Sequence, residues 1–438
     1  MFEKILSSSY VGLIKSKSIQ NFLFLGIIQS SNILISLVSM PLLINSIGLD
    51  QFGLVNLSLS VIMLLNILVG FGYNLSAPRE VAINQQNTKV LSKLVSNIIS
   101  SKSLLAGTSA LIILIAVFGF NLFKEYQVIL VFSMLLLFSE ATLPLWFFQG
   151  LEKMKLISIA NVFSRLLYLC GIILFIHQPH QAKWVNFILG GSGLLTNLLV
   201  ILYVHYELEI HLFRPDLKQI FQSLKDNILL FFSNIASHIS VNGGLIILSF
   251  FATAETLGMF SLAEKITMVL RMLPALVIQA IFPHASKQYE KNRKDFLKFL
   301  KRAYLNGLFL GLCLSVFTYF SAPLIVGVLA KSRLEDAIVY LKILAFVPLL
   351  ACLNIANVLI FLVTNRKKEL FRASWLMCIF MVSASLILTT NYGAIGLCFA
   401  LISTEVVIFI ISTFLIYSNE KSLFHGFKNS FFGSSHSG

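Results

Sequence analysis

Charged residues are scarce in this sequence, and acidic ones scarcest. They make up 12% of the 438 residues, with 19 Asp and Glu against 33 Lys and Arg. Soluble domains carry about twice that charged fraction. Because 57% of residues are hydrophobic and the mean hydropathy is +0.86, a soluble globular protein is excluded. The formal charge of +14 does not indicate a nucleic-acid partner, because the cations fall in short loops between apolar runs.

Motifs of catalysis and metal binding are also missing. The sequence has no Gly-Lys-Ser/Thr phosphate loop, no HExxH pair and no nucleophile elbow. Its five cysteines all fall within apolar runs without paired spacing, and His177 and His180 are too sparse for a metal site. We therefore expect no disulfide framework, no metal and no enzymatic activity. An intramembrane glycan-assembly enzyme is the runner-up class.

Long apolar runs are what the sequence does contain. A membrane core about 30 Å thick needs roughly 20 apolar residues per helix, and backbone groups in lipid must be hydrogen-bonded within the segment. The runs are too long for the strands of a membrane barrel. The sequence therefore predicts an all-α integral membrane protein with about 12 transmembrane helices. The predicted spans are 20–44, 54–76, 97–120, 126–148, 157–177, 184–205, 227–252, 257–283, 304–330, 337–363, 373–391 and 393–417.

The basic residues indicate the orientation of these spans. Most lie in the loops that share a side with the chain ends, so both termini are predicted to be cytoplasmic. Residues Met1 to Gln20 show no cleavable signal peptide, and the first span is expected to act as its own signal anchor. The opposite loops carry only the cations Lys124, Lys183, Lys331 and Arg333.

Three longer cytoplasmic loops, about 77–96, 206–226 and 284–303, are expected to form amphipathic surface helices. For the basic stretch from Lys287 to Arg302, the simplest interpretation is an interfacial helix on anionic lipid headgroups.

A weak internal repeat divides the chain. Ser-Asn-Ile occurs at 31–33 in the first span and at 233–235 in the seventh, and similar Leu-x-x-Phe segments lead into the second and eighth spans. Two halves of equal topology predict two six-helix bundles around a central cavity. The predicted domains are residues 1–213 and 214–438.

Charged side chains at membrane depth are costly unless they face a bundle interior or water, so each is a candidate functional residue. Two of them lie near the ends of their spans, where long side chains can reach the interface, and a structural role is equally open for these two, Arg165 and Lys342. The full set is Glu140, Arg165, Glu264, Lys265, Arg271, Lys342 and Glu405.

The eighth span carries the densest polar cluster. Glu264, Thr267 and Arg271 share one helical face, with Lys265 adjacent. A net positive stripe suits an anionic substrate, and Arg271 can hold a phosphate bidentately. The alternative is an ion pair between Glu264 and Arg271 that holds helices together.

A second polar stripe follows the seventh span at Asn234, His238 and Asn242, and polar residues 29–32 accompany it in the first span. Helix packing is the default role for the amides. His238 could relay a proton, or be a neutral hydrogen-bonded histidine. Glu140 and Glu405 are expected to be isolated carboxylates near the middle of spans four and twelve. The candidates for coupling to H⁺ or Na⁺ are therefore Glu264, Glu140, Glu405 and His238.

Four short motifs occur in this order along the chain: Ile47 to Gly53, Gly70-Phe71-Gly72 through Pro78-Arg79-Glu80, Pro144 to Glu152, and Tyr392 to Gly396. Taken singly, Gly70-Phe71-Gly72 can simply end a helix, and Pro144 with Trp146 can be a kink and an interfacial anchor. Together they resemble the polysaccharide flippases of the Wzx type in the multidrug/oligosaccharidyl-lipid/polysaccharide exporter superfamily. One departure is Val69, where members of the family often have an acidic residue.

The resemblance implies a flippase of the bacterial inner membrane that moves an undecaprenyl-pyrophosphate-linked glycan, such as an O-antigen unit, to the outer leaflet by alternating access. It also implies membrane lipids, a polysaccharide polymerase and a chain-length regulator as partners, and no cofactor beyond a coupling ion. A multidrug exporter and a passive scaffold for glycan-assembly enzymes are the alternatives. The candidate substrate-binding residues are Arg271, Lys265, Arg79, Arg165 and Asn234.

Overall fold

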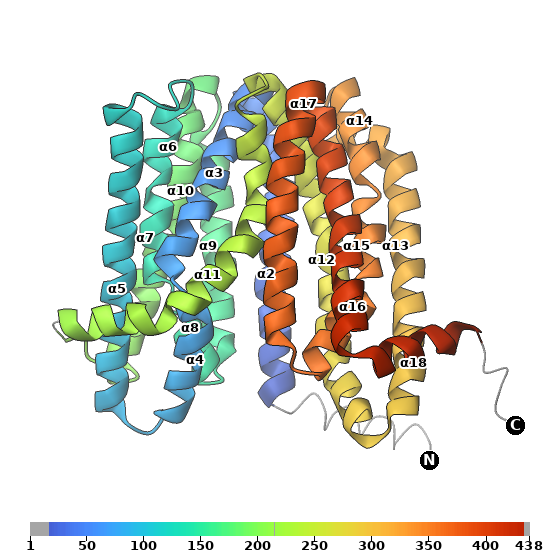
Figure 1. Cartoon of the computed structure of the whole chain (residues 1–438). Helices are drawn as coiled ribbons and strands as arrows, with labels where there is room; N and C mark the ends of the chain where they lie inside the picture. Colours follow the sequence, from blue (N-terminus) through green and yellow to red (C-terminus); the bar gives the residue numbers. More distant parts are fainter. Residues whose placement is uncertain (1–16, 214, 433–438) are drawn as a thin grey trace, which may run out of the picture. The chain divides into compact units, whose positions relative to one another are not determined.

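The computed structural model describes residues 17–213 and 215–432, and every regular element in these ranges is a helix (Figure 1). The predicted all-α class is confirmed. The predictions for the chain ends, including the missing signal peptide in Met1 to Gln20 and the cytoplasmic termini, fall largely on residues outside the described ranges.

The described residues form two compact units, the first ending at Ile235 and the second beginning at Ala236. The predicted domain division falls at Arg214, which is not among the described residues, and it stays a prediction. The first unit contains α2 (Lys17–Ile47), α3 (Leu49–Gly70), α4 (Tyr73–Ile83), α5 (Thr88–Leu114), η1 (Ile115–Gly119), α6 (Gln127–Ser133), α7 (Leu135–Thr142), α8 (Leu145–Gly150), α9 (Met154–Phe175), η2 (Pro179–Gln181), α10 (Ala182–Tyr206) and the first part of α11 (Leu217–Leu248).

The second unit begins inside α11 and ends with a short amphipathic helix, α18 (Lys421–Phe432). Leu423 of α18 is buried in the same hydrophobic cluster as Phe296 and Leu300 of α13 (Arg293–Ala330). Its helices after α11 are α12 (Ala254–Lys291), α13 (Arg293–Ala330), α14 (Glu335–Leu344), α15 (Val347–Leu353), α16 (Ile355–Val363), α17 (Lys367–Asn419) and α18 (Lys421–Phe432).

The number of membrane spans agrees with the prediction. Nine helices of the described part are long and apolar enough to cross a membrane, and two bent pairs raise the number to 11. One of the nine has 52 residues, about 78 Å of helix, which is more than twice a membrane core. Gly393 inside it has non-helical angles (φ 57°, ψ −139°), and Figure 1 shows the chain reversing direction within α17. This element is therefore two spans, as predicted at 373–391 and 393–417.

A glycine allows the two arms of α17 to meet. A Cβ added at Gly396 would overlap the carbonyl group of Leu388, although in a straight helix these residues would be about 12 Å apart. We expect Gly396→Ala to destabilise the protein by about 1–3 kcal/mol or more, because a rigid backbone cannot yield. The control is Gly327→Ala in α13, where an added Cβ meets nothing within 4 Å. Equal melting temperatures of the two variants in detergent would contradict this packing.

The loops predicted as surface helices differ in outcome. The first part of α11 runs across the other helices of its unit in Figure 1, in agreement with the prediction for 206–226. The stretch from Lys287 to Arg302 is not a separate interfacial helix, and that prediction was wrong. It forms the adjoining ends of α12 and α13, because Asn292 interrupts the helix and its side chain accepts a hydrogen bond from the Lys294 backbone at 2.9 Å.

Candidate functional site

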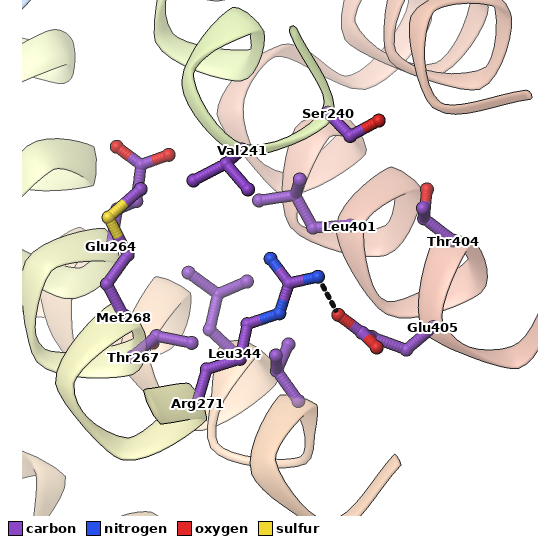
Figure 2. Close-up of a pocket in the computed structure, with 11 residues that line it drawn as sticks. Ser240, Val241, Glu264, Thr267, Met268, Arg271, Leu344, Leu401, Thr404 and Glu405 are labelled. Atoms are coloured by element: carbon purple, nitrogen blue, oxygen red, sulfur yellow. Dashed lines mark ion pairs between the residues drawn. The ribbon is translucent and has the colours of Figure 1, made fainter. Parts of the chain in front are cut away.

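A small pocket with a cavity volume of about 40 Å³ lies within the second unit, where α11, α12, α14, α15 and α17 meet. The side chain of Arg271 extends from α12 into its centre (Figure 2). Its wall combines apolar side chains with hydroxyl groups and charged groups. The lining residues are Ser240, Val241, Glu264, Thr267, Met268, Arg271, Leu344, Val347, Leu401, Thr404 and Glu405.

Arg271 is paired with a carboxylate from another helix. Its Nη2 lies 2.5 Å from Oε1 of Glu405 on α17, and the two side chains are 31% and 7% exposed. The ion pair between Glu264 and Arg271, which the sequence analysis left open as an alternative, is therefore not formed, and that alternative was wrong. The expectation that Glu405 is isolated was also wrong. Helical spacing showed Glu264 and Arg271 on one face of α12 but contained no information about the facing helix. The other terminal nitrogen of the guanidinium points into the pocket (Figure 2).

The charge of this pocket differs from the predicted one. Glu264, Thr267 and Arg271 do share the pocket-lining face of α12, as expected. Lys265, about 100° around the helix, does not line it. Since Glu405 enters from α17, two carboxylates face one guanidinium, and the prediction of a net positive site is wrong for this pocket.

Hydrogen bonding makes the pocket richer in acceptors than in donors. The hydroxyls of Ser240, Thr267 and Thr404 each donate to the backbone carbonyl four residues earlier, at 2.8, 2.9 and 2.7 Å. Their remaining capacity is acceptance only. Among the described residues, Glu264 makes no hydrogen bond and no ion pair within 4.0 Å, although it interacts electrostatically with the adjacent Lys265. The arrangement can therefore hold a proton or Na⁺ on its oxygens and an anion on Arg271.

Other predicted residues near this unit lie outside the pocket. Lys265 is half-buried beside Glu264, Asn234 is half-buried on α11, and the His238 side chain is exposed. Asn242 donates to the backbone carbonyl of His238 at 3.2 Å, which is helix-internal bonding. On α11 the pocket is lined by Ser240 and Val241 instead of by the predicted polar stripe.

A second ion pair lies inside the first unit. Nζ of Lys102 on α5 is 3.3 Å from Oε1 of Glu140 on α7, and the Lys102 side chain is 0% exposed. The prediction that Glu140 is isolated was therefore wrong. Sequence reasoning missed Lys102 because it lies between Ser101 and Ser103 near the start of the predicted span and looked like part of a loop. The signal that could have found it is the apolar run on both sides, which makes a 32-residue span, Thr88–Gly119.

Arg165 occupies a polar seam between α2 and α9. Its Nε donates to Oδ1 of Asn32 at 2.7 Å, and Ser31 donates to Oδ1 of Asn161 at 3.1 Å. This seam accounts for part of the polar segment predicted in the first span, and Asn161 was not identified from the sequence. Arg79 is exposed on α4. Lys342 packs its ammonium over the ring of Tyr319, 5.5 Å from the centroid.

The motif from Pro144 to Glu152, one of those behind the family resemblance, acts in packing. Leu143 and Pro144 separate α7 from α8, so the predicted kink is present. Trp146 is buried in the core of the first unit instead of being exposed as an interfacial anchor. Gly150 of α8 packs closely on α4, since a Cβ there would lie 2.5 Å from Cβ of Val81.

Comparison with known proteins agrees with this fold. Two solved structures are each 16% identical to the chain. The first is a multidrug resistance MATE family transporter of the MOP superfamily in an inward-facing conformation, and the second is lipid II flippase MurJ in an inward closed conformation. The first has a TM-score of 0.71, with 92% of this chain and 99% of that one covered, and the second 0.69, with 94% and 91% covered. At this identity they show the fold alone.

Sequence comparison identifies the family. A protein from Escherichia coli (strain K12) named "Putative O-antigen transporter" is 24% identical over 405 residues, which are 92% of this chain and 97% of that protein. The family model described as "Polysaccharide biosynthesis protein" matches residues 18–289, more than half of the chain. The chain therefore belongs to the polysaccharide biosynthesis protein family and has the multi-pass membrane fold of the transporters above.

Proposed function

We propose that the protein is a flippase that moves a lipid-linked oligosaccharide from the cytoplasmic to the outer leaflet of a bacterial inner membrane. Three observations support this: the family match, the name of the Escherichia coli relative, and the fold that the chain shares with a lipid II flippase. The proposed cargo is a short glycan, such as an O-antigen unit, on undecaprenyl pyrophosphate. A polysaccharide polymerase and a chain-length regulator are the partners we propose.

The observation that carries the proposal at the level of residues is the position of Arg271. It is a partly exposed guanidinium in a pocket inside a membrane-spanning unit, with one terminal nitrogen paired to Glu405 and the other directed into the pocket. A guanidinium suits the oxygens of a diphosphate better than an ammonium does, because its planar donors bind bidentately. In this proposal, Arg271 binds the pyrophosphate of the cargo.

Ion coupling follows from competition at Arg271. A diphosphate and the Glu405 carboxylate compete for the same guanidinium. When the anion binds, Glu405 loses its counter-ion in a site where its side chain is 7% exposed. A buried carboxylate without a cation is costly, so it gains from taking up H⁺ or Na⁺. Loading of the anion and of the cation are then thermodynamically linked. Glu264, across the pocket, is a second acceptor for the cation.

The functional test is deletion of the gene in its own host. We expect loss of surface polysaccharide and accumulation of undecaprenyl-linked oligosaccharide on the cytoplasmic leaflet. Complementation with the natural gene should restore both. Unchanged surface glycan with increased sensitivity to cationic drugs would refute the flippase and favour a multidrug exporter, whose cargo the two pocket carboxylates would also suit.

Glu264→Gln is expected to reduce export to near the level of the deletion strain while leaving the melting temperature of the purified protein almost unchanged. Glu264 has no ion pair to lose among the described residues, and the amide keeps its shape but cannot take up a proton. The control is Glu255→Gln, an exposed carboxylate at the start of the same helix. Export at the natural level from Glu264→Gln would remove this residue from the coupling site.

A further inference from the structure

The first part of α11, residues 217–232, has three distinct faces. It precedes a bend of 55° to the second part, Asn234–Leu248, and runs across the other helices of the first unit (Figure 1). At about 100° per residue, Ile220, Leu224, Asn227 and Phe231 fall on one side. Ile220 and Asn227 are buried there against the protein.

The buried face packs against the Gly70-Phe71-Gly72 turn. Phe71 ends α3 in the left-handed region (φ 37°), and its ring stacks on Phe231 with centroids 4.5 Å apart and planes 12° apart. Gly72 (φ 79°) touches α11, since a Cβ there would lie 2.8 Å from Cβ of Leu230 and 3.4 Å from the Asn227 carbonyl oxygen. The motif therefore does more than end a helix, because only glycine fits this contact.

The start of α11 is attached to α5. Asn97 donates to Oε1 of Gln219 at 2.7 Å. In the preceding loop, the backbone amides of His211 and Phe213 donate to the hydroxyls of Ser92 and Ser96, at 3.1 and 2.8 Å. The segment is thus positioned at both ends, by α5 at its start and by the Gly70-Phe71-Gly72 turn near its bend.

An apolar stripe beside the buried face is exposed. It consists of Leu217, Phe221, Ile228 and Phe232, all exposed, with Phe221 at 67%. These positions lie within about 60° of one another on the helix. An apolar stripe of this kind on a crossing helix suits the boundary between headgroups and acyl chains.

The lysines of the segment border that stripe. Lys218 and Lys225 are exposed and lie directly beside the apolar residues, whereas Gln219 and Asp226 lie about 100° farther around. Going around the helix, the buried face is therefore followed by the apolar stripe, with the two lysines at its outer edge, and then by the side that carries Leu229, Gln219 and Asp226. Lysines at the edge of an apolar face attract anionic headgroups, and the acidic residue is directed away from them.

We propose that residues 217–232 bind the anionic surface of the cytoplasmic leaflet. The apolar stripe lies in the lipid, and Lys218 and Lys225 contact phosphate headgroups. The Gly70-Phe71-Gly72 turn holds the helix in this position from the protein side. The partner is the phospholipid bilayer itself. This inference is independent of the cargo that the protein moves.

The test is amide hydrogen exchange of residues 217–232 in full-length protein, in nanodiscs of phosphatidylcholine alone or mixed with phosphatidylglycerol. We expect phosphatidylglycerol to slow exchange in this segment by up to about 30-fold, about fivefold per lysine. Lys218→Gln/Lys225→Gln should abolish the difference. The matched control Lys124→Gln/Lys331→Gln, with exposed lysines in the predicted outer loops, should keep it. Equal exchange in both lipids, or loss of the difference in the control, would overturn the proposal.

The packing of α11 against the Gly70-Phe71-Gly72 turn is tested separately with Gly72→Ala. It should accelerate exchange in residues 217–232 in either lipid while residues of α9 and α10 keep their protection, because the added methyl group separates α11 from the turn. Gly107→Ala in α5, where a Cβ meets nothing within 4 Å, is the control. Unchanged exchange in Gly72→Ala would refute the role assigned to the turn in positioning α11.

Discussion

The Arg271→Met variant is expected to lose export of surface polysaccharide to the level of the deletion strain and to be less stable than the natural protein. Without the guanidinium, Glu405 is left without a cation at 7% exposure. Removing one partner of a buried pair costs about 3–5 kcal/mol, and the lower end applies because Arg271 is 31% exposed. Surface glycan on gels and the melting temperature in detergent measure the two effects.

A double variant separates the two effects. Arg271→Met/Glu405→Met removes both charges, and apolar replacement of a buried pair is often neutral, so the melting temperature should return close to the natural value. Export should stay lost, because no guanidinium remains for the anion. Recovery of export in the double variant would mean that Arg271 only neutralises Glu405, and the proposed anion ligand would be wrong.

Glu140→Gln is expected to destabilise the protein more than Lys102→Met does. Glu140→Gln leaves the ammonium of Lys102 without its counter-ion at 0% exposure, at a cost of about 3–5 kcal/mol. Lys102→Met leaves a carboxylate whose side chain is 24% exposed and less completely enclosed by protein. Melting temperatures of the two single variants test this order, and the reverse order would contradict it.

The double variant Lys102→Met/Glu140→Leu also tests what the pair does. Two apolar residues of similar volume should restore most of the stability. Export retained by this variant would make the pair structural and remove Glu140 from the coupling candidates. Export lost from a stable double variant would keep Glu140 among them.

Most of the membrane architecture could be predicted from the sequence, because the hydrophobic length of a span is a local property. The least obvious case is α17, whose two arms form one helix of 53 residues by backbone assignment. The predicted break between residues 391 and 393 agrees with the non-helical Gly393. The misjudged case is the basic stretch from Lys287 to Arg302. Its charges are typical of a surface helix, but its backbone continues two long helices across a cap at Asn292.

The candidate site could be predicted only in part. Helical spacing brought Glu264, Thr267 and Arg271 to one face of α12, and the pocket contains all three. The partner of Arg271 could not be predicted, because Glu405 is 134 positions away in the sequence and nothing local indicates which helix faces α12. Lys102 was missed for a related reason, since its serine neighbours resemble a loop unless the burial is known.

By itself, the sequence determined that the chain is an all-α multi-pass membrane protein, about where its apolar spans lie, and which charges apart from Lys102 fall inside them. These follow from the cost of exposing backbone and charge to lipid, a cost that each segment meets alone. Only the tertiary structure decided which charges neutralise one another and what the Gly70-Phe71-Gly72 turn supports. Ion pairs and close contacts form between helices distant in sequence, so their geometry depends on packing that no local pattern records.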